Sequence, residues 1–151
     1  MPVQPAADEA SPPPLQGSVL YIEDVELNYL VVEGILARHP GVALRRATTG
    51  AEGVRLVRGE LPDFVLLDMH LPDMSGLDVI RLLSEIIAER QLRITILTGD
   101  KLTTDVIKAM SLGAYEYMVK PVNAALLEAG LRRALTGKHA SAANSLPRER
   151  G

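Results

Sequence analysis

Short apolar runs alternate along the chain with longer stretches whose apolar residues recur at helical spacing. The apolar runs predict five strands, at residues 19–22, 42–47, 64–68, 94–97 and 115–119. The helical spacing predicts five helices, within residues 27–36, 50–60, 77–87, 106–113 and 127–135. Strands that alternate with helices in this way predict an α/β domain, a five-stranded parallel sheet covered by helices on both faces.

Polar residues stand where the predicted strands end. Because crossovers between parallel strands are right-handed, all five carboxyl ends should lie along one edge of the sheet, where ligands bind in such folds. The residues at these ends are Glu23, Asp24, Asp68, Thr98 and Lys120. Each has an ordinary structural explanation on its own, such as a helix cap, a turn or a solvated charge. Their joint occurrence at the strand ends favours a functional site.

The predicted cluster suits phosphoryl chemistry. Three neighbouring carboxylates repel one another, and Mg²⁺ relieves such repulsion by binding carboxylate and phosphate oxygens. Lys120 adds a compact positive charge that suits a phosphoryl oxygen or Asp68 itself, and Thr98 adds a hydroxyl donor. An aspartate carboxylate can attack phosphorus and form an aspartyl phosphate, while the groups around it neutralise charge.

Composition narrows the remaining possibilities. Hydrophobic residues make up 47% of the 151 residues, enough for one core, and there is no cysteine for disulfides or thiolate metal sites. A formal charge of −3 gives no general attraction to nucleic acid or to an anionic membrane. No apolar run is long enough to span a bilayer, and no signal peptide is evident. We therefore expect a cytoplasmic protein.

Both ends of the chain differ in composition from the middle. Residues 1–17 contain five prolines and few large apolar groups, which predicts a disordered, proline-rich leader. Residues 138–151 predict a flexible C-terminal tail. The domain itself is expected between residues 18 and 137.

Four motifs together resemble the receiver domain of two-component response regulators. They are, in order, "VLYIED", "VLLDMHLPDMSGLD", "ITILTGD" and "YEYMVKP". The resemblance covers roughly residues 18 to 137. It implies a CheY-like, flavodoxin-like, doubly wound fold with strand order 2-1-3-4-5.

The resemblance also implies a role for each site residue. Asp68 would accept the phosphoryl group, with Lys120 and Thr98 contacting it. Asp24 and Asp68 would bind Mg²⁺ directly, Glu23 would act through water, and the backbone carbonyl of His70 would complete the protein ligands.

Further residues are expected to serve switching. In the resemblance, Tyr117 matches the aromatic residue of receivers whose rotamer reports activation. Pro121 matches a receiver proline that is preceded by a cis peptide bond. Gly76 is expected to take a backbone conformation that other residues resist.

His70 and Asp100 stand where receivers tune phosphoryl lifetime. Their side chains either meet over the site or are solvated independently.

The function expected from this resemblance is a stand-alone switch. It would take a phosphoryl group from a histidine kinase or phosphotransfer protein, then bind a protein target or dimerise through its fourth helix, fifth strand and fifth helix. The alternatives are a pseudo-receiver that carries no phosphate and a receiver excised from a hybrid histidine kinase. An enzyme is disfavoured, since His70 stands where an aspartate-based phosphatase needs a second acid, and no glycine-rich nucleotide motif is present.

Overall fold

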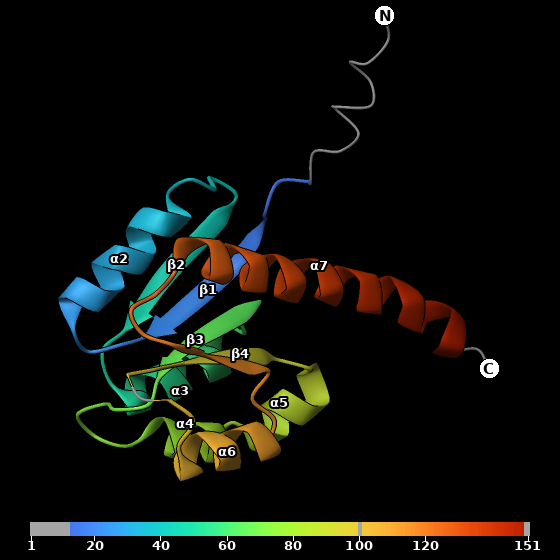
Figure 1. Ribbon diagram of the computed structural model, residues 1–151. Coiled ribbons are helices and arrows are strands. Elements are labelled where there is room, and N and C mark those ends of the chain that lie inside the picture. Colours follow the sequence, from blue (N-terminus) through green and yellow to red (C-terminus); the bar gives the residue numbers. More distant parts are fainter. Residues whose placement is uncertain (1–12, 100, 150–151) are drawn as a thin grey trace, which may run out of the picture.

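The strands of the computed structural model form one parallel sheet in the order β2-β1-β3-β4-β5, as predicted (Figure 1). The structure describes the backbone of residues 13–99 and 101–149 and the side chains of residues 13–99 and 101–136. The strands are β1 (Gly17–Ile22), β2 (Val42–Ala47), β3 (Phe64–Asp68), β4 (Arg93–Thr98) and β5 (Glu116–Val119). The order places β1 beside β3, where successive crossovers turn in opposite directions along the sheet.

Helices cover both faces of this sheet. Figure 1 shows helices on either side of the strands, and their buried residues form two separate core clusters. On the first face are α2 (Glu26–Leu36) and α7 (Ala124–Glu149). On the second are α3 (Gly50–Gly59), α4 (Gly76–Leu82), α5 (Ser84–Arg90) and α6 (Thr104–Ser111). In the described part of the chain, no helix has the length and apolar character needed to cross a membrane.

Strand alternation divides the core between the two faces. In β1, Leu20 and Ile22 pack toward α3 and α4, whereas Val19 and Tyr21 pack toward α2 and α7. All residues of β3 are buried, which explains why its sequence reads as a continuous apolar run rather than an alternating one.

The described residues form six helices, one more than predicted. The single helix expected over residues 77–87 is divided at Leu83, which has φ −101° and ψ 7°. The Nη2 of Arg58 donates a hydrogen bond of 3.0 Å to the carbonyl oxygen of Leu82. A side chain that takes a carbonyl out of the helical ladder distorts the helix at that point.

The described secondary structure extends past both predicted boundaries of the domain. Leu15, assigned to the leader, is buried against the α2 and α7 face, and β1 already begins at Gly17. At the other end α7 continues to Glu149, past the boundary predicted after residue 137. Residues 1–12 of the predicted leader and residues 150–151 of the predicted tail lie outside the described residues.

Gly76 is needed for a reason other than the one expected. Its φ is not in the left-handed region, so the prediction that Gly76 takes a conformation other residues resist is wrong. A Cβ at this position would lie 2.9 Å from the carbonyl oxygen of Asp68 and 2.8 Å from the sulfur of Met69. The absence of a side chain therefore lets the start of α4 pack directly against the end of β3.

We expect Gly34→Ala to stabilise the protein. Gly34 lies inside α2, and a Cβ there would meet nothing within 4 Å. Alanine reduces the conformational freedom of the unfolded chain, so the free energy of unfolding should rise by about 0.5–1 kcal/mol. Denaturant unfolding measures this change.

Gly53→Ala is the matched control for Gly34→Ala. Gly53 lies inside α3, but a Cβ there would collide with the side chain of Ile22. This replacement should lower the free energy of unfolding by roughly 1–3 kcal/mol. Equal effects of the two replacements would contradict the packing described for α3.

Candidate functional site

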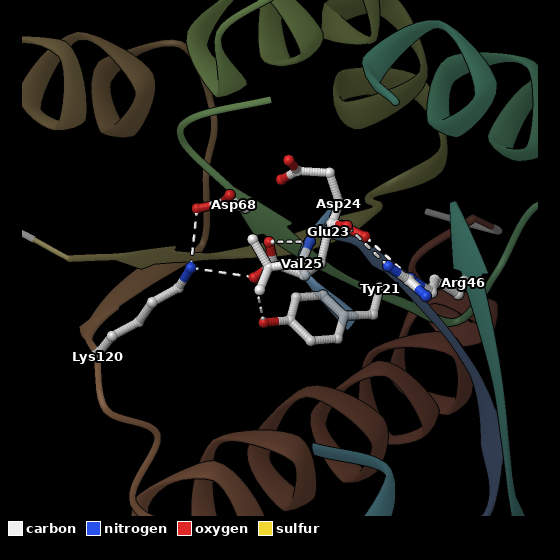
Figure 2. A network of polar contacts seen from close by, with 7 residues as sticks. All are labelled: Tyr21, Glu23, Asp24, Val25, Arg46, Asp68 and Lys120. Atoms are coloured by element: carbon white, nitrogen blue, oxygen red, sulfur yellow. Dashed lines mark hydrogen bonds and ion pairs between the residues drawn. The ribbon is translucent and has the colours of Figure 1, made fainter. Parts of the chain in front are cut away.

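Two of the predicted residues at the strand ends, Glu23 and Asp68, come together around the ammonium of Lys120 (Figure 2). Its Nζ donates to Oε1 of Glu23 and to Oδ1 of Asp68, each at 3.0 Å. Glu23 is fully buried and Asp68 is 5% exposed. Residues separated by 97 and 52 positions in sequence thus share one partly buried ion-pair cluster.

Strand alternation explains why these three side chains meet. Leu66 and Met118 pack on the α2 and α7 side of the sheet. Asp68 and Lys120 each follow one of these residues by two positions, so their side chains project to the same side. Glu23 stands in the same relation to the buried Tyr21.

The acidic residues are arranged in a way that fits a divalent cation. Ligand oxygens of Glu23, Asp24 and Asp68 all lie within 4.8 Å of one another. Glu23 and Asp68 are buried, whereas Asp24 is exposed and leaves the cluster open to solvent. Hard carboxylate oxygens with room for water ligands are the coordination that Mg²⁺ prefers.

The pKa values of the two buried acids, Glu23 and Asp68, are shifted in opposite directions. Burial raises the pKa of Asp68, and the negative charge of Glu23 keeps it raised despite the hydrogen bond from Lys120. Burial would also raise the pKa of Glu23, but Lys120, the Val25 N–H and the Tyr21 hydroxyl outweigh burial and lower it. The ionised form is therefore favoured at Glu23 and disfavoured at Asp68, although Lys120 lies 3.0 Å from both.

Burial works against the charge of Lys120, but its two partners prevail. Burial would lower the pKa of the ammonium, whereas its hydrogen bonds to Asp68 and Glu23 raise that pKa overall. Lys120 thus stays charged and can neutralise negative charge at Asp68.

Two residues predicted to contact the phosphoryl group or to serve switching, Thr98 and Tyr117, lie on β4 and β5. Thr98 is 2% exposed at the end of β4, and its carbonyl oxygen accepts from the backbone N–H of Lys120 at 2.7 Å. Tyr117 lies on β5 beside Ile96 and is 37% exposed. The peptide bond between Lys120 and Pro121 is cis, as predicted.

A solvent-open cleft adjoins the site between β3, β4 and α6. Its lining residues are Met69, His70, Ser75, Thr98, Thr103, Thr104 and Asp105. His70 is exposed and pairs with Ser75 across the loop after β3. Asp100 lies outside the described residues, so its contact with His70 stays a prediction, as does metal ligation by the His70 carbonyl.

Three supporting residues were not predicted. Tyr21 donates its hydroxyl to Oε1 of Glu23 at 3.0 Å, and Arg46 donates to backbone carbonyl oxygens of the acidic pair. Asp73 accepts the N–H groups of Gly50 and Ala51, which attaches the loop after β3 to the start of α3.

The signal for these residues differs in strength. Tyr21 stands two positions before Glu23 in a strand, so alternation places both on one face and could have indicated a contact. The roles of Arg46 and Asp73 depend on the β1–β2 register and on the course of a loop. Neither can be read from local pattern.

Two curated relatives align with most of this chain. The transcriptional regulatory protein AfsQ1 of Streptomyces coelicolor is 36% identical over 118 residues, which cover 78% of this chain and 51% of AfsQ1. The chain thus spans about half the length of that relative. Protein PilH of Pseudomonas aeruginosa is 29% identical over 79% of this chain and 98% of its own length.

A solved receiver-domain structure is also similar to this chain. The receiver domain of the sensor histidine kinase PA1611 from Pseudomonas aeruginosa, which has a magnesium ion coordinated in its active-site cleft, is 27% identical. It matches with a TM-score of 0.69 over 80% of this chain and 98% of its own. The family model of the response regulator receiver domain matches residues 19–132. With its parallel sheet and its acidic cluster around a partly buried lysine, this chain belongs to the receiver domains of two-component response regulators.

Proposed function

We propose that this receiver is a switch that carries a phosphoryl group on Asp68. The observation that supports this most is the position of the Asp68 carboxylate, 5% exposed and 3.0 Å from the ammonium of Lys120. A pseudo-receiver without phosphorylation is the alternative, and it does not need these five chemically matched residues at the strand ends. The role is that of a phosphoacceptor with at most slow self-dephosphorylation.

The transfer step uses one oxygen of the Asp68 carboxylate as nucleophile. That oxygen forms a bond to the phosphorus of a phosphohistidine donor, while the P–N bond breaks and the imidazole keeps its electron pair. Lys120 neutralises negative charge on the phosphoryl oxygens, and the Thr98 hydroxyl donates to one of them. Hydrolysis later breaks the bond between Asp68 and phosphorus.

Glu23, Asp24 and Asp68 would hold Mg²⁺ in this scheme. When bound, the ion offsets the charge shared by the carboxylates and the incoming phosphoryl group. Asp24, being exposed, leaves this position accessible from solvent. Glu23 already accepts three hydrogen bonds, from Lys120, Tyr21 and Val25, so its part in metal binding would be through water.

The output surface proposed for the switch is formed by α6, β5 and α7. Ile107, Tyr117 and Val119 are 52%, 37% and 44% exposed there. Phosphorylation would draw Thr98 toward the phosphoryl group, and Tyr117 would follow it inward because both belong to the joined ends of β4 and β5. The altered surface would bind a protein target or a second copy of the chain.

The donor would be a histidine kinase or a phosphotransfer protein. PilH, which this chain matches over 98% of its length, supports a stand-alone receiver. The receiver domain of the sensor kinase PA1611 supports the alternative of a receiver taken from a hybrid kinase. The cytoplasmic location stays a prediction.

Acetyl phosphate with Mg²⁺ should phosphorylate the wild-type chain at Asp68. We expect intact-mass measurement to show one added phosphoryl group, which Asp68→Asn abolishes because the amide lacks the nucleophilic oxygen. Asp105→Asn, which alters an exposed acid in the neighbouring cleft, should retain the adduct. A wild-type chain that gains no phosphoryl group would favour the pseudo-receiver.

Asp68→Asn should stabilise the metal-free protein at pH 7. Because the pKa of Asp68 is raised in the folded chain, the folded chain binds this proton more tightly than the unfolded chain does. The resulting stabilisation is fully present below the ordinary pKa of 3.8 and is lost as the pH rises through the folded-state pKa. The neutral amide should therefore raise the free energy of unfolding on the order of 1 kcal/mol at pH 7. The gain should shrink as the pH approaches 3.8.

Mg²⁺ should reverse this order of stability. At about 100 times its Kd, the ion should stabilise the wild type by about 2.7 kcal/mol, and Asp68→Asn much less. Thermal unfolding with and without Mg²⁺ measures both effects. Glu89→Gln, which removes an exposed charge on α5 and leaves the site intact, should match the wild type both with and without Mg²⁺. A metal-free Asp68→Asn less stable than wild type would contradict the electrostatics given above.

Tyr117→Trp should report the switch by fluorescence, because the chain has no tryptophan of its own. Phosphorylation should reduce acrylamide quenching of this indole, because the ring would turn from the surface toward the site. Tyr115→Trp, at a position 36% exposed that precedes β5, is the control and should keep its quenching. Unchanged quenching at residue 117 would refute the coupling.

A further inference from the structure

Arg46 holds the backbone of both acidic residues that follow β1. Its Nε donates to the carbonyl oxygen of Glu23 at 3.0 Å, and its Nη2 donates to that of Asp24 at 2.9 Å. Figure 2 shows Arg46 on one side of this acidic pair, with Asp68 and Lys120 on the other. The two carbonyl oxygens therefore point away from the site while the carboxylates serve it.

Aromatic rings connect the guanidinium of Arg46 back to the carboxylate of Glu23. The guanidinium carbon lies 5.3 Å from the centre of the Tyr29 ring, which stacks on Tyr21 with 6.2 Å between centroids. Tyr21 in turn donates its hydroxyl to Oε1 of Glu23. Glu23 is thus held at its carbonyl by Arg46 and at its carboxylate by Tyr21.

Apart from Arg46, hydrogen bonds in the described part of the chain hold this turn at Glu23 and Val25, on either side of Asp24. Residues 23–25 belong to no strand or helix, and Val25 offers no side-chain cap to α2. The N–H of Glu23 donates to Ala47 at 2.9 Å, which anchors the beginning of the turn. Asp24 is exposed, so its backbone orientation depends largely on the bond from Arg46.

We propose that Arg46 is a positioning residue for the metal site, which it supports by holding the acidic turn from behind. This inference rests on the proposed binding of Mg²⁺ by Glu23, Asp24 and Asp68. A planar guanidinium can donate to two carbonyl oxygens at once in a fixed geometry, which a lysine ammonium on a flexible stem does not reproduce. Partners behind metal ligands commonly change metal affinity by 10- to 100-fold.

The sign of the effect separates positioning from simple electrostatics. Arg46 is a cation, and a cation near the site repels Mg²⁺. If charge alone mattered, its removal would tighten Mg²⁺ binding. Positioning gives the opposite result, because a turn released from Arg46 presents its carboxylates in many orientations.

Calorimetric titration of the full chain with Mg²⁺ tests this inference. Arg46→Ala should weaken binding about tenfold, and Arg46→Lys should lie between it and the wild type. Arg45→Ala is the matched control, since Arg45 is its neighbour in β2 but bonds Glu60 at 3.2 Å. This control should change the Kd less than about twofold.

A second readout needs no metal. In Mg²⁺-free protein, hydrogen exchange at the N–H of Val25, which donates to Oε2 of Glu23, should speed up in Arg46→Ala but not in Arg45→Ala. If Arg46→Ala does not fold, Arg46→Lys decides by the same two measurements.

The possible failures are distinguishable. An Arg46→Ala chain, or in its place Arg46→Lys, that binds Mg²⁺ as tightly as wild type or more tightly overturns the positioning role and leaves the proposed function standing. A wild-type chain that binds no Mg²⁺, or an Asp68→Asn chain that binds it equally well, overturns the proposed function together with this inference.

Discussion

The ammonium of Lys120, 3.0 Å from carboxylate oxygens of both Glu23 and Asp68, is the interaction on which the arrangement of the site depends. Two buried carboxylates this close would repel each other strongly without a cation between them. Lys120 comes from the chain after β5, the acids from the ends of β1 and β3, so the bridge spans four of the five strands. This cation between the acids makes an ionised Asp68 tolerable inside the protein.

The bridge leaves Asp68 and Glu23 in different electrostatic states. Lys120, Tyr21 and Val25 together lower the pKa of Glu23, whereas burial and the neighbouring charge raise that of Asp68. Asp68, whose pKa is raised, is the residue that stands at the phosphoacceptor position. Such a difference between adjacent acids is common where one of them has a chemical role and the other supports it.

Supports on the far side of the strand ends keep this arrangement in place. Arg46 bonds the carbonyl oxygens of the acidic turn, and Asp73 bonds the N–H groups at the start of α3. Gly76 lets α4 approach the end of β3 without a side chain between them. These contacts restrain the backbone after β1 and after β3, while the cleft next to the site is open to solvent.

The strands, the faces of the helices and the residues at the strand ends were all accessible from the sequence alone. They follow from apolar periodicity, which is local in the sequence, and from the general rule that the carboxyl ends of parallel strands lie along one edge of the sheet. The division of the predicted helix at Leu83, the packing role of Gly76 and the bonds of Arg46 were not accessible. Each depends on which distant atoms come within a few ångströms, through the β1–β2 register or the approach of one helix to another strand. Only the tertiary structure decides such contacts, because no local pattern encodes the distance between segments that are remote in sequence.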